Sequence, residues 1–392
     1  MKTSDTSKSN ILYLDSGSGI GGGQRSLLLL LDLLDKARFR PFVGCLGDSS
    51  FAAEVEKTAA RVIPLSLPAA HNKTDKVKRF TLRDLLEDFR QLRVIVELHR
   101  AVKRHAIDLI HANSLSVALL GGIVARINRI PILMHKRYAT SYGVLDRFCE
   151  KLLHRVILVS EATRWDFAPV EKQTLIYNGV NLGAFQASPE EIETLRTELF
   201  SDDEPDPAVL VGVVTRITPE KGIHVLVSAI RELKGKANVK LLIVGGPYFE
   251  KDVAYMDTLK QEVADLGIED SVIFTGFLSD TRIVTSLLDI VLVPSIIPEA
   301  CPRTIIEAMA VGKPVIATPL GGSKELVTPE TGILVPPEDA LAVADAITTL
   351  AADQERLTAM GDAARDRAVQ LFSSEKNTAL TEAVYADLLA AS

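Results

Sequence analysis

Cysteine is scarce in this sequence, and its placement argues against two kinds of site. The three residues, Cys45, Cys149 and Cys301, are odd in number and widely spaced, and no C-x-x-C pair occurs. This pattern speaks against a disulfide framework and against a zinc site. We therefore expect three buried free thiols.

Long apolar runs are also lacking. No run reaches the roughly 18 to 20 residues that a membrane-spanning helix needs. The first ten residues, MKTSDTSKSN, are polar and no signal-peptide core follows them. A composition of 47% hydrophobic and 24% charged residues fits a soluble globular enzyme. Because the sequence shows neither a membrane span nor a signal-peptide core, we expect a cytoplasmic protein. The length of 392 residues favours two or three domains.

The sequence lacks an even distribution of charge. Residues 1–185 hold 27 Lys and Arg against 18 Asp and Glu, a balance of +9, and the rest holds 17 against 33, a balance of −16. Much of the positive excess lies in residues 73–104, a basic amphipathic segment with interleaved acids. Such a segment is typical of contact with an anionic membrane or an acidic acceptor, and the alternative is a solvated helix face. We expect no nucleic-acid partner. The basic residues are Lys73, Lys76, Lys78, Arg79, Arg83, Arg90, Arg93, Arg100, Lys103 and Arg104.

Short apolar runs alternate with helical patterns, which is typical of a parallel sheet covered by helices. An acidic stretch with prolines at 199–208 is the expected linker, and the alternation restarts after it. The sequence thus predicts two doubly wound α/β domains, 1–190 and 200–371. Ligands of open α/β sheets bind at the carboxyl ends of the strands, so two such domains facing each other would share a cleft. The expected strands are 10–16, 40–48, 107–114, 131–138 and 155–162 in the first domain and 208–217, 239–248, 271–278, 289–295, 314–319 and 332–337 in the second; the expected helices include 23–37, 222–235, 255–267 and 304–312.

The stretch LYLDSGSGIGGGQRSLLLLL, residues 12–31, turns through five glycines between a strand and a helix. Gly17, Gly19 and Gly22 satisfy G-x-G-x-x-G, the dinucleotide-binding pattern. A glycine-rich turn at a helix N-terminus suits any phosphate, so the pattern alone does not identify the ligand. A nicotinamide-dependent dehydrogenase is disfavoured, because Asp48 is the nearest acid to the second strand and lies beyond its end.

Two cations follow the first strand of the second domain, in TRITPEKG. Arg216 and Lys221 lie between a strand and a helix, where backbone N–H groups are free. Arginine grips phosphate oxygens bidentately and lysine adds a point charge, so the pair suits a diphosphate. The alternative is that the two residues are surface cations on a loop with no role in binding.

Two carboxylates flank the start of a later helix, in PEACPRTIIEAMAVGKPVIATPLGG. Glu299 lies in the loop before the helix and Glu307 inside it, with Pro302 at the expected first helical position. Arg303 and Thr304 would lie in the first turn. The uncapped helix start can hold a phosphate, with carboxylates on either side to accept hydrogen bonds from sugar hydroxyls.

In sequence order, these stretches resemble the family 4 retaining glycosyltransferases of GT-B fold. The resemblance covers nearly the whole chain, and its last part implies a C-terminal helix, 372–392, that packs back on the first domain. The stretches that carry it are GGGQRSLL, RVILVSEATRWDF, IYNGVNLGAF, TRITPEKGIHVLVSAI, LLIVGG, VIFTGFLSD, the Glu299 to Glu307 region, GGSKELV, TGILVPPED and FSSEKNTALTEAVYADLL.

The resemblance implies a role for each candidate residue. Arg216 and Lys221 would hold the diphosphate of a nucleotide-sugar, Glu299 would bind donor-sugar hydroxyls, and Glu307 would bind the ribose. His135, at the end of a first-domain strand, matches the histidine that this family places near the donor sugar. Gly22 and Gly23 match the family's glycine pair, whose backbone approaches the donor phosphates or the acceptor, and Arg303 and Thr304 belong to the same donor region.

The sequence also departs from the family pattern at several positions. Gln24 stands where many relatives have Glu, Asn181 replaces a frequent Asp in a turn, and the residues after Glu299 lack the usual glycine and aromatic residues. The last departure borders the donor sugar, so the sequence does not identify that sugar.

The expected reaction is sugar transfer from a nucleotide-diphosphate sugar to an acceptor hydroxyl with the α configuration kept. We expect no cofactor and no metal, with UDP or GDP in the donor and a glycan or lipid-linked acceptor of surface polysaccharide or glycolipid assembly. A nucleotide-sugar epimerase or a glycosyl phosphorylase of the same architecture is the alternative. A periplasmic-type binding protein also has a hinged cleft, but it would normally carry an export signal.

Overall fold

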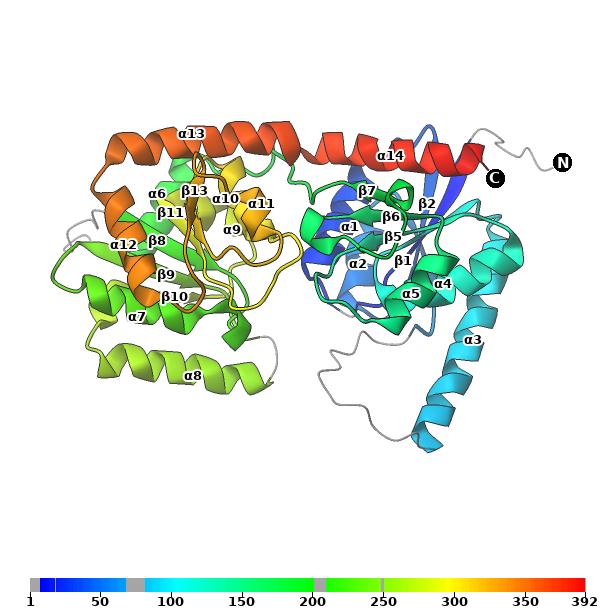
Figure 1. The fold of residues 1–392 in the computed structure, drawn as a ribbon, viewed down its shortest axis with the longest axis horizontal. Helices are drawn as coiled ribbons and strands as arrows, with labels where there is room; N and C mark the ends of the chain where they lie inside the picture. The colour runs from blue at the N-terminus through cyan, green and yellow to red at the C-terminus, as the bar shows by residue number, and fades with distance from the viewer. Residues whose placement is uncertain (1–7, 18, 68–81, 201–208, 248–249, 392) are drawn as a thin grey trace. The chain divides into compact units, whose positions relative to one another are not determined.

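The chain forms two compact α/β units. The computed structural model describes residues 8–17, 19–67, 82–200, 209–247 and 250–391 (Figure 1). Unit 1 comprises Met1–Gly179 and Ser374–Ser392, and unit 2 comprises Val180–Ser373. Each unit holds one fully parallel sheet, so the predicted pair of doubly wound domains is confirmed as the fold class.

Unit 1 is built on a seven-stranded sheet of order β3-β2-β1-β4-β5-β6-β7. Alternate residues of its buried central strands face opposite sides, as the pleat requires. On β1, Leu12 and Leu14 join the core under α3, α4 and α5, whereas Ile11 and Tyr13 join the core under α1, α2 and the C-terminal helix α14. The strands are β1 Ser9–Leu14, β2 Phe39–Cys45, β3 Arg61–Pro64, β4 Leu109–Ala112, β5 Ile132–Lys136, β6 Arg155–Leu158 and β7 Gln173–Leu175.

The helices of unit 1 cover both faces of this sheet (Figure 1). On the first helix, apolar residues at helical spacing, Leu27, Leu30 and Leu31, form the buried stripe. The last helix returns to unit 1 after the whole of unit 2 and packs against the first helix. The helices are α1 Gly22–Leu33, α2 Ser50–Glu56, α3 Leu82–Arg104, α4 Leu115–Asn128, α5 Val144–Leu152 and α14 Ser374–Ala390, with 3-10 turns η1 Glu161–Thr163 and η2 Val170–Lys172.

Unit 2 has a six-stranded sheet of order β10-β9-β8-β11-β12-β13, again fully parallel. The order reverses at β8 and β11, which is where ligands bind in open sheets of this kind. The strands are β8 Val209–Val214, β9 Val239–Val244, β10 Val272–Gly276, β11 Ile290–Val293, β12 Val315–Ala317 and β13 Gly332–Leu334. The helices are α6 Pro189–Leu199, α7 Ile223–Leu233, α8 Glu250–Asp265, α9 Thr281–Leu287, α10 Arg303–Ala310, α11 Ser323–Leu326, α12 Ala340–Ala351 and α13 Gln354–Leu371, with η3 Pro219–Lys221 and η4 Glu269–Ser271.

Several details differ from the sequence predictions. The short strands β3 and β7, at the two edges of the first sheet, were not expected. The contacts divide the chain after Gly179 and after Ser373, whereas the sequence reading ended the first domain at 190. Pro302 is the N-cap of α10 and not its first residue, because its ψ of 117° is extended. Most of the expected linker, and the basic residues from Lys73 to Arg79, lie outside the described residues.

Two further expectations concern burial and membranes. The three cysteines are free and buried, as predicted. In the part of the chain that the structure describes, no helix has both the length and the apolarity needed to cross a bilayer.

Candidate active site

The carboxyl ends of β8 and β11, where the strand order of unit 2 reverses, lie against each other through their following loops. Gly222, between η3 and α7, has a φ of +66°, and a Cβ there would lie 2.1 Å from the carbonyl oxygen of Pro294. The backbone N–H of Ile296 donates to the carbonyl of Glu220 at 3.0 Å. Glycine is required at this contact by both conformation and space, and the two loops therefore form one surface.

Lys221 and Glu299 meet on this surface, although 78 residues separate them. Nζ of Lys221 lies 2.7 Å from Oε2 of Glu299, and each side chain is about one-fifth exposed. The hydroxyl of Ser295 donates to the other carboxylate oxygen of Glu299. Thr318 in turn donates to the carbonyl of Ser295 at 2.6 Å. The carboxylate is thus held in one orientation beside an ammonium group.

The turn at Gly321 and Gly322 fixes the backbone of Glu299. Gly321 has a φ of +60°, and a Cβ on it would lie 2.1 Å from the carbonyl oxygen of Glu299. The N–H of Gly322 donates to that same oxygen at 2.7 Å. A residue with a side chain at Gly321 would push this loop away, so the turn fixes the position of the Glu299 backbone.

Helix α10 presents the remaining unit 2 candidates. The side-chain hydroxyl of Thr304 donates to the carbonyl of Val214 at 3.0 Å, which ties the helix to the end of β8. Glu307 is buried, and its Oε1 lies 3.1 Å from the guanidinium of Arg303. The ion pair stabilises a carboxylate that would otherwise be costly to bury.

A small pocket at the end of β8 and β11 brings some of the predicted residues together. Lys221, Ser295, Glu299 and Thr304 line it, with backbone and apolar side chains of the two strands. Arg216 is exposed in the loop after β8, and neither it nor Glu307 is among the lining residues. The structure thus groups three of the six unit 2 candidates directly and places the other three within the adjoining loop and helix.

In unit 1, Gly22 and Gly23 are the first two residues of α1. A Cβ on Gly23 would lie 3.3 Å from the side chain of Arg137, so the glycine allows that side chain to cross the helix start. Gln24 is tied down here. Its amide donates to Asp15 at 2.8 Å, and its oxygen accepts from the N–H of Gly21 at 3.1 Å. In this structure Gln24 orders the glycine loop.

A polar network that the sequence analysis missed surrounds this helix start. Asn113 donates to Oδ2 of Asp15 at 2.5 Å and accepts from Nε of Arg137 at 2.7 Å. Nη1 of Arg137 donates to Oδ1 of Asn178 at 2.6 Å, which also accepts from Ser26 at 3.2 Å. A signal was available, because Asp15, Asn113 and Arg137 each follow a buried strand directly and parallel strands end at one edge.

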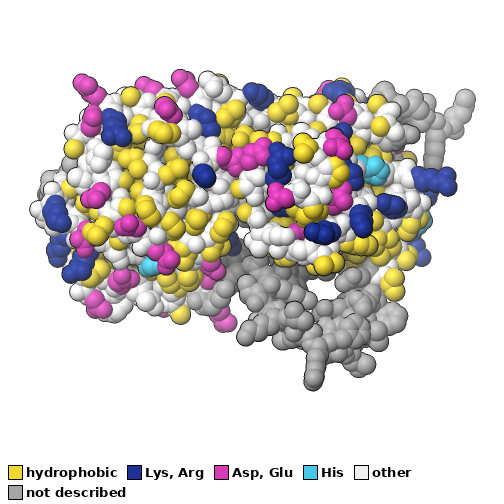
Figure 2. Space-filling model, in the orientation of Figure 1, with side chains coloured by type: hydrophobic (Ala, Val, Ile, Leu, Met, Phe, Trp, Pro, Cys, Tyr) yellow, Lys and Arg dark blue, Asp and Glu magenta, His cyan; other side chains and the backbone are white. Residues whose placement is uncertain are grey.

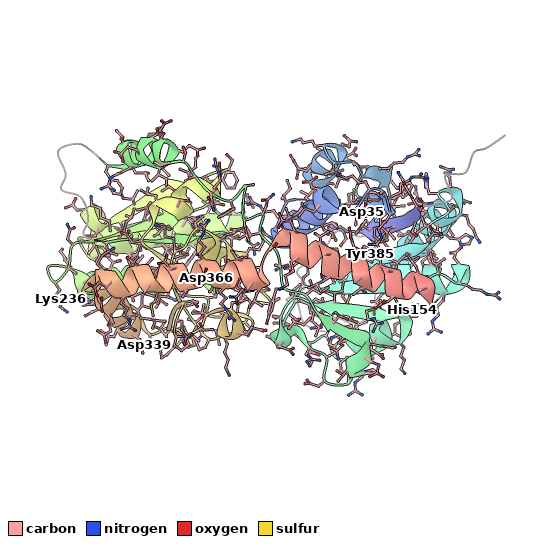
Figure 3. All side chains as sticks on the ribbon, turned by 90° about the horizontal axis from the view of Figure 1, so that it is seen from above. Asp35, His154, Lys236, Asp339, Asp366 and Tyr385 are labelled. Atoms are coloured by element: carbon pink, nitrogen blue, oxygen red, sulfur yellow. The ribbon has the colours of Figure 1, made fainter. Side chains whose placement is uncertain are left out.

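His135, at the end of β5, is buried and belongs to a chain of aromatic side chains. Its Nδ1 lies 2.8 Å from Nε2 of His111, whose Nδ1 lies 2.6 Å from the hydroxyl of Tyr385 on α14. The Tyr385 hydroxyl donates to that of Tyr13 at 3.2 Å. Figure 3 shows Tyr385 on the C-terminal helix, which supplies this link.

Both histidines of this chain are neutral at ordinary pH. Burial, with a smaller contribution from the charge of Arg137, lowers the pKa of His111 to about 3. The same two causes, together with His111, hold the pKa of His135 well below its usual value. Burial likewise raises the pKa of Tyr13 and of Tyr385. The four hydrogen-bonded side chains therefore carry no charge, and the directions of their hydrogen bonds depend on which ring nitrogens bear protons.

His135 also lines a cavity of about 40 Å³ within unit 1. The cavity is bounded by α1, by the loop after β7 and by the start of α14. Its polar lining includes Arg137 and Asn178 of the network above. Among the described residues, none forms a hydrogen bond with Nε2 of His135, the ring nitrogen that His111 does not occupy.

Two family models match the chain in succession. The model described as Glycosyltransferase Family 4 matches residues 20–184, and the model described as Glycosyl transferases group 1 matches residues 196–367. The chain belongs to the family 4 glycosyltransferases. The family matches set aside the dehydrogenase, binding-protein and epimerase alternatives.

Solved and curated relatives agree with this membership. The crystal structure of Anabaena Alr3699/HepE in complex with UDP is 26% identical to this glycosyltransferase, with a TM-score of 0.83 over 96% of this chain and 100% of that one. The lipopolysaccharide core biosynthesis mannosyltransferase LpcC of Rhizobium leguminosarum bv. viciae is 29% identical, over 78% of this chain and 86% of its own length. The GT-B fold predicted from sequence is thereby confirmed.

A mycobacterial relative matches over a shorter stretch. The GDP-mannose-dependent alpha-(1-6)-phosphatidylinositol monomannoside mannosyltransferase of Mycobacterium tuberculosis (strain H37Rv) is 30% identical over 226 residues. That match covers 54% of this glycosyltransferase and 56% of the relative, so the chain spans little more than half of that protein's length.

Proposed function

We propose that this family 4 glycosyltransferase moves a sugar from a nucleoside diphosphate sugar to an acceptor hydroxyl and keeps the anomeric configuration. The observation that carries the proposal is the Lys221 to Glu299 pair, held at 2.7 Å in a pocket where the strand order of unit 2 reverses. The ammonium suits the diphosphate and the carboxylate suits sugar hydroxyls.

The roles of the other residues follow from the charges that develop during transfer. Negative charge builds on the leaving diphosphate, and fixed cations at Arg216 and Lys221 offset it. Positive charge builds at the anomeric carbon. The acceptor hydroxyl attacks the face that the diphosphate leaves, and the negatively charged leaving phosphate accepts the proton of that hydroxyl. Glu307, ion-paired to Arg303 inside α10, binds the ribose, and His135 binds the donor sugar. The backbone at Gly22 and Gly23 approaches the donor phosphates.

The two cations also make a bound metal unnecessary, so we propose transfer without a metal or other cofactor. UDP and GDP are the favoured nucleotides. The Anabaena structure was solved with UDP, and the mycobacterial relative is named for its dependence on GDP-mannose. Activity that persists with a chelator present would support the metal-independent reaction, and activity restored only by added Mg²⁺ or Mn²⁺ would overturn it.

For the acceptor we propose a glycan or a lipid-linked saccharide of glycolipid or surface polysaccharide assembly, reached from the cytoplasmic face of a membrane. Two relatives support this class by name, one for a lipopolysaccharide core and one for a phosphatidylinositol mannoside. The positive excess of residues 1–185 fits an anionic acceptor surface. We propose that the basic segment 73–104 contacts that surface.

Calorimetric titration with UDP, GDP, ADP and their sugar conjugates tests the donor class. We expect micromolar binding of one nucleotide to the wild type and loss of that binding in Arg216→Ala/Lys221→Ala. The variant Lys236→Ala/Lys240→Ala is the matched control, because it removes two cations of unit 2 outside the pocket lining. If no nucleotide bound, or if both double variants bound like the wild type, the proposed function would fail. NMR of the product then reports whether the anomeric configuration is kept.

A further inference from the structure

Helix α5 of unit 1 turns an apolar face to solvent. Val144, Leu145 and Phe148 are 82%, 51% and 52% exposed, at positions that share one side of the helix. Tyr142, just before the helix, is 52% exposed. These four residues, with Arg147 and Lys151, are called the α5 surface below. So many large apolar side chains on one short segment are unusual on a face that meets only water.

The exposed charges of α5 are all positive. Arg147 and Lys151 are exposed on the outer face, whereas the two acids of the helix turn inward. Asp146 is fully buried, and Glu150 is paired with Lys172 at 2.8 Å. The guanidinium of Arg147 lies 5.5 Å from the ring centre of Phe167, a further exposed aromatic residue. The helix therefore presents bulky apolar groups and cations together (Figure 2 shows yellow and dark blue side chains side by side on this face of unit 1).

The inner side of the segment is firmly anchored. The carboxylate of Asp146 accepts hydrogen bonds from the hydroxyl of Tyr138 at 2.8 Å, from Ser141 at 3.1 Å and from the N–H of Tyr142 at 2.7 Å. Cys149 and Leu153 pack into the core beneath the helix. Because the fold already holds this side, the apolar outer residues are not needed for packing within unit 1.

We propose that the α5 surface docks this enzyme onto a bilayer that contains anionic lipids. An amphipathic helix whose apolar residues enter the acyl boundary while flanking cations meet lipid phosphates binds in this way. The outward positive charge favours an anionic bilayer over a second copy of the chain, because two such helices face to face would bring four cations together. The proposal deepens the proposed function, since a lipid-linked acceptor lies in the same bilayer.

Co-sedimentation of the full chain with phosphatidylcholine vesicles, with and without phosphatidylglycerol, tests this surface. We expect wild-type protein to bind the anionic vesicles. Leu145→Ser/Phe148→Ser should lower the partition coefficient about tenfold or more, because each side chain withdraws apolar surface from water on insertion. Arg147→Glu/Lys151→Glu should weaken the preference for anionic vesicles. All four side chains are exposed, so these variants should fold.

Leu341→Ser/Val369→Ser, which removes two similarly exposed residues of unit 2, is the matched control and should bind vesicles like the wild type. Equal binding by the wild type and the Leu145→Ser/Phe148→Ser variant would overturn the proposal, and so would an absence of binding to any vesicle. A dimer in solution that dissociates on Leu145→Ser/Phe148→Ser would overturn it in favour of a second copy. Nucleotide titrations of the same preparations separate the two proposals, because loss of vesicle binding with nucleotide binding intact affects only the docking surface.

Discussion

Nε2 of His111 lies 2.8 Å from Nδ1 of His135, so one of these neutral rings must donate and the other accept. The direction follows from Tyr385. Its hydroxyl donates to Tyr13, so it accepts from Nδ1 of His111, 2.6 Å away. Nε2 of His111 then bears no proton and accepts from Nδ1 of His135. His135 is left with a bare Nε2, which can accept a hydrogen bond from a sugar hydroxyl.

Tyr385→Phe should reverse this order of protons. Without the hydroxyl, the N–H at Nδ1 of His111 has no acceptor, and the ring gains by moving its proton to Nε2 and donating to His135. Imidazole ¹⁵N shifts report the change directly in the free enzyme. Tyr255→Phe, which removes a hydroxyl 3.0 Å from Nδ1 of His224 in unit 2, is the control. Unchanged shifts for His111 and His135 in Tyr385→Phe would contradict the assignment.

The two buried histidines should make unit 1 sensitive to acid. The unfolded chain takes up their protons below about pH 6.5, whereas folded His111 stays neutral down to about pH 3 and folded His135 also stays neutral well below 6.5. Since the unfolded state then binds more protons, stability falls with pH from about 6.5 downward, by about 1.4 kcal/mol per unit for each histidine. Urea unfolding followed through Trp165, the one tryptophan of the sequence and a residue of unit 1, measures this. His111→Gln should flatten the slope between pH 6.5 and 4, and an unchanged slope would refute the account.

Gly321→Ala should weaken both unit 2 and donor binding. The new Cβ would meet the carbonyl oxygen of Glu299 in a left-handed conformation, at a cost of about 1–3 kcal/mol. Scanning calorimetry should show a lower unfolding temperature than that of the wild type. Titration should show a larger loss of affinity for the nucleotide-sugar than for the bare nucleotide. Gly246→Ala places its Cβ in open space and should change neither. Equal behaviour of the two variants would remove the positioning role of the turn.

Glu299→Gln should separate nucleotide binding from sugar transfer. The carboxylate pairs with Lys221 and competes with a diphosphate for its ammonium group, so its neutralisation should keep or raise the affinity for the nucleotide. Transfer should fall at least tenfold, because a hydrogen-bond acceptor for the donor sugar is weakened. Lys221→Ala should instead lose nucleotide affinity by about ten- to a hundredfold. A Glu299→Gln variant with full transfer activity would argue against a role at the sugar.

The central strands could be read from sequence because each is a continuous apolar run between turns. The edge strands β3 and β7 could not, since Arg61–Pro64 and Gln173–Leu175 are short and only half-buried. The loop glycines were visible, but the reason for Gly321, its contact with the carbonyl of Glu299, depends on a close backbone approach that no local pattern encodes.

The same distinction holds for the candidate site. Arg216, Lys221 and Glu299 could be proposed because motifs surround them, and His135 because the family resemblance supplies it. The partners of His135 could not, since 274 residues separate His111 from Tyr385 and only the return of α14 to unit 1 brings them together. A search for polar residues directly after buried strands would have predicted Asp15, Asn113 and Arg137.

The return of α14 also has a consequence for how the chain is made. Val384, Tyr385 and Leu388 complete the core face of unit 1 that α1 and β1 share, yet they leave the ribosome after every residue of unit 2. Unit 2 is one continuous stretch and can fold as soon as it is synthesised. Until α14 is made, one apolar face of unit 1 stays uncovered. Unit 1 therefore cannot complete its core until unit 2 has been synthesised, and a nascent chain stalled before Ser374 would leave that apolar face uncovered.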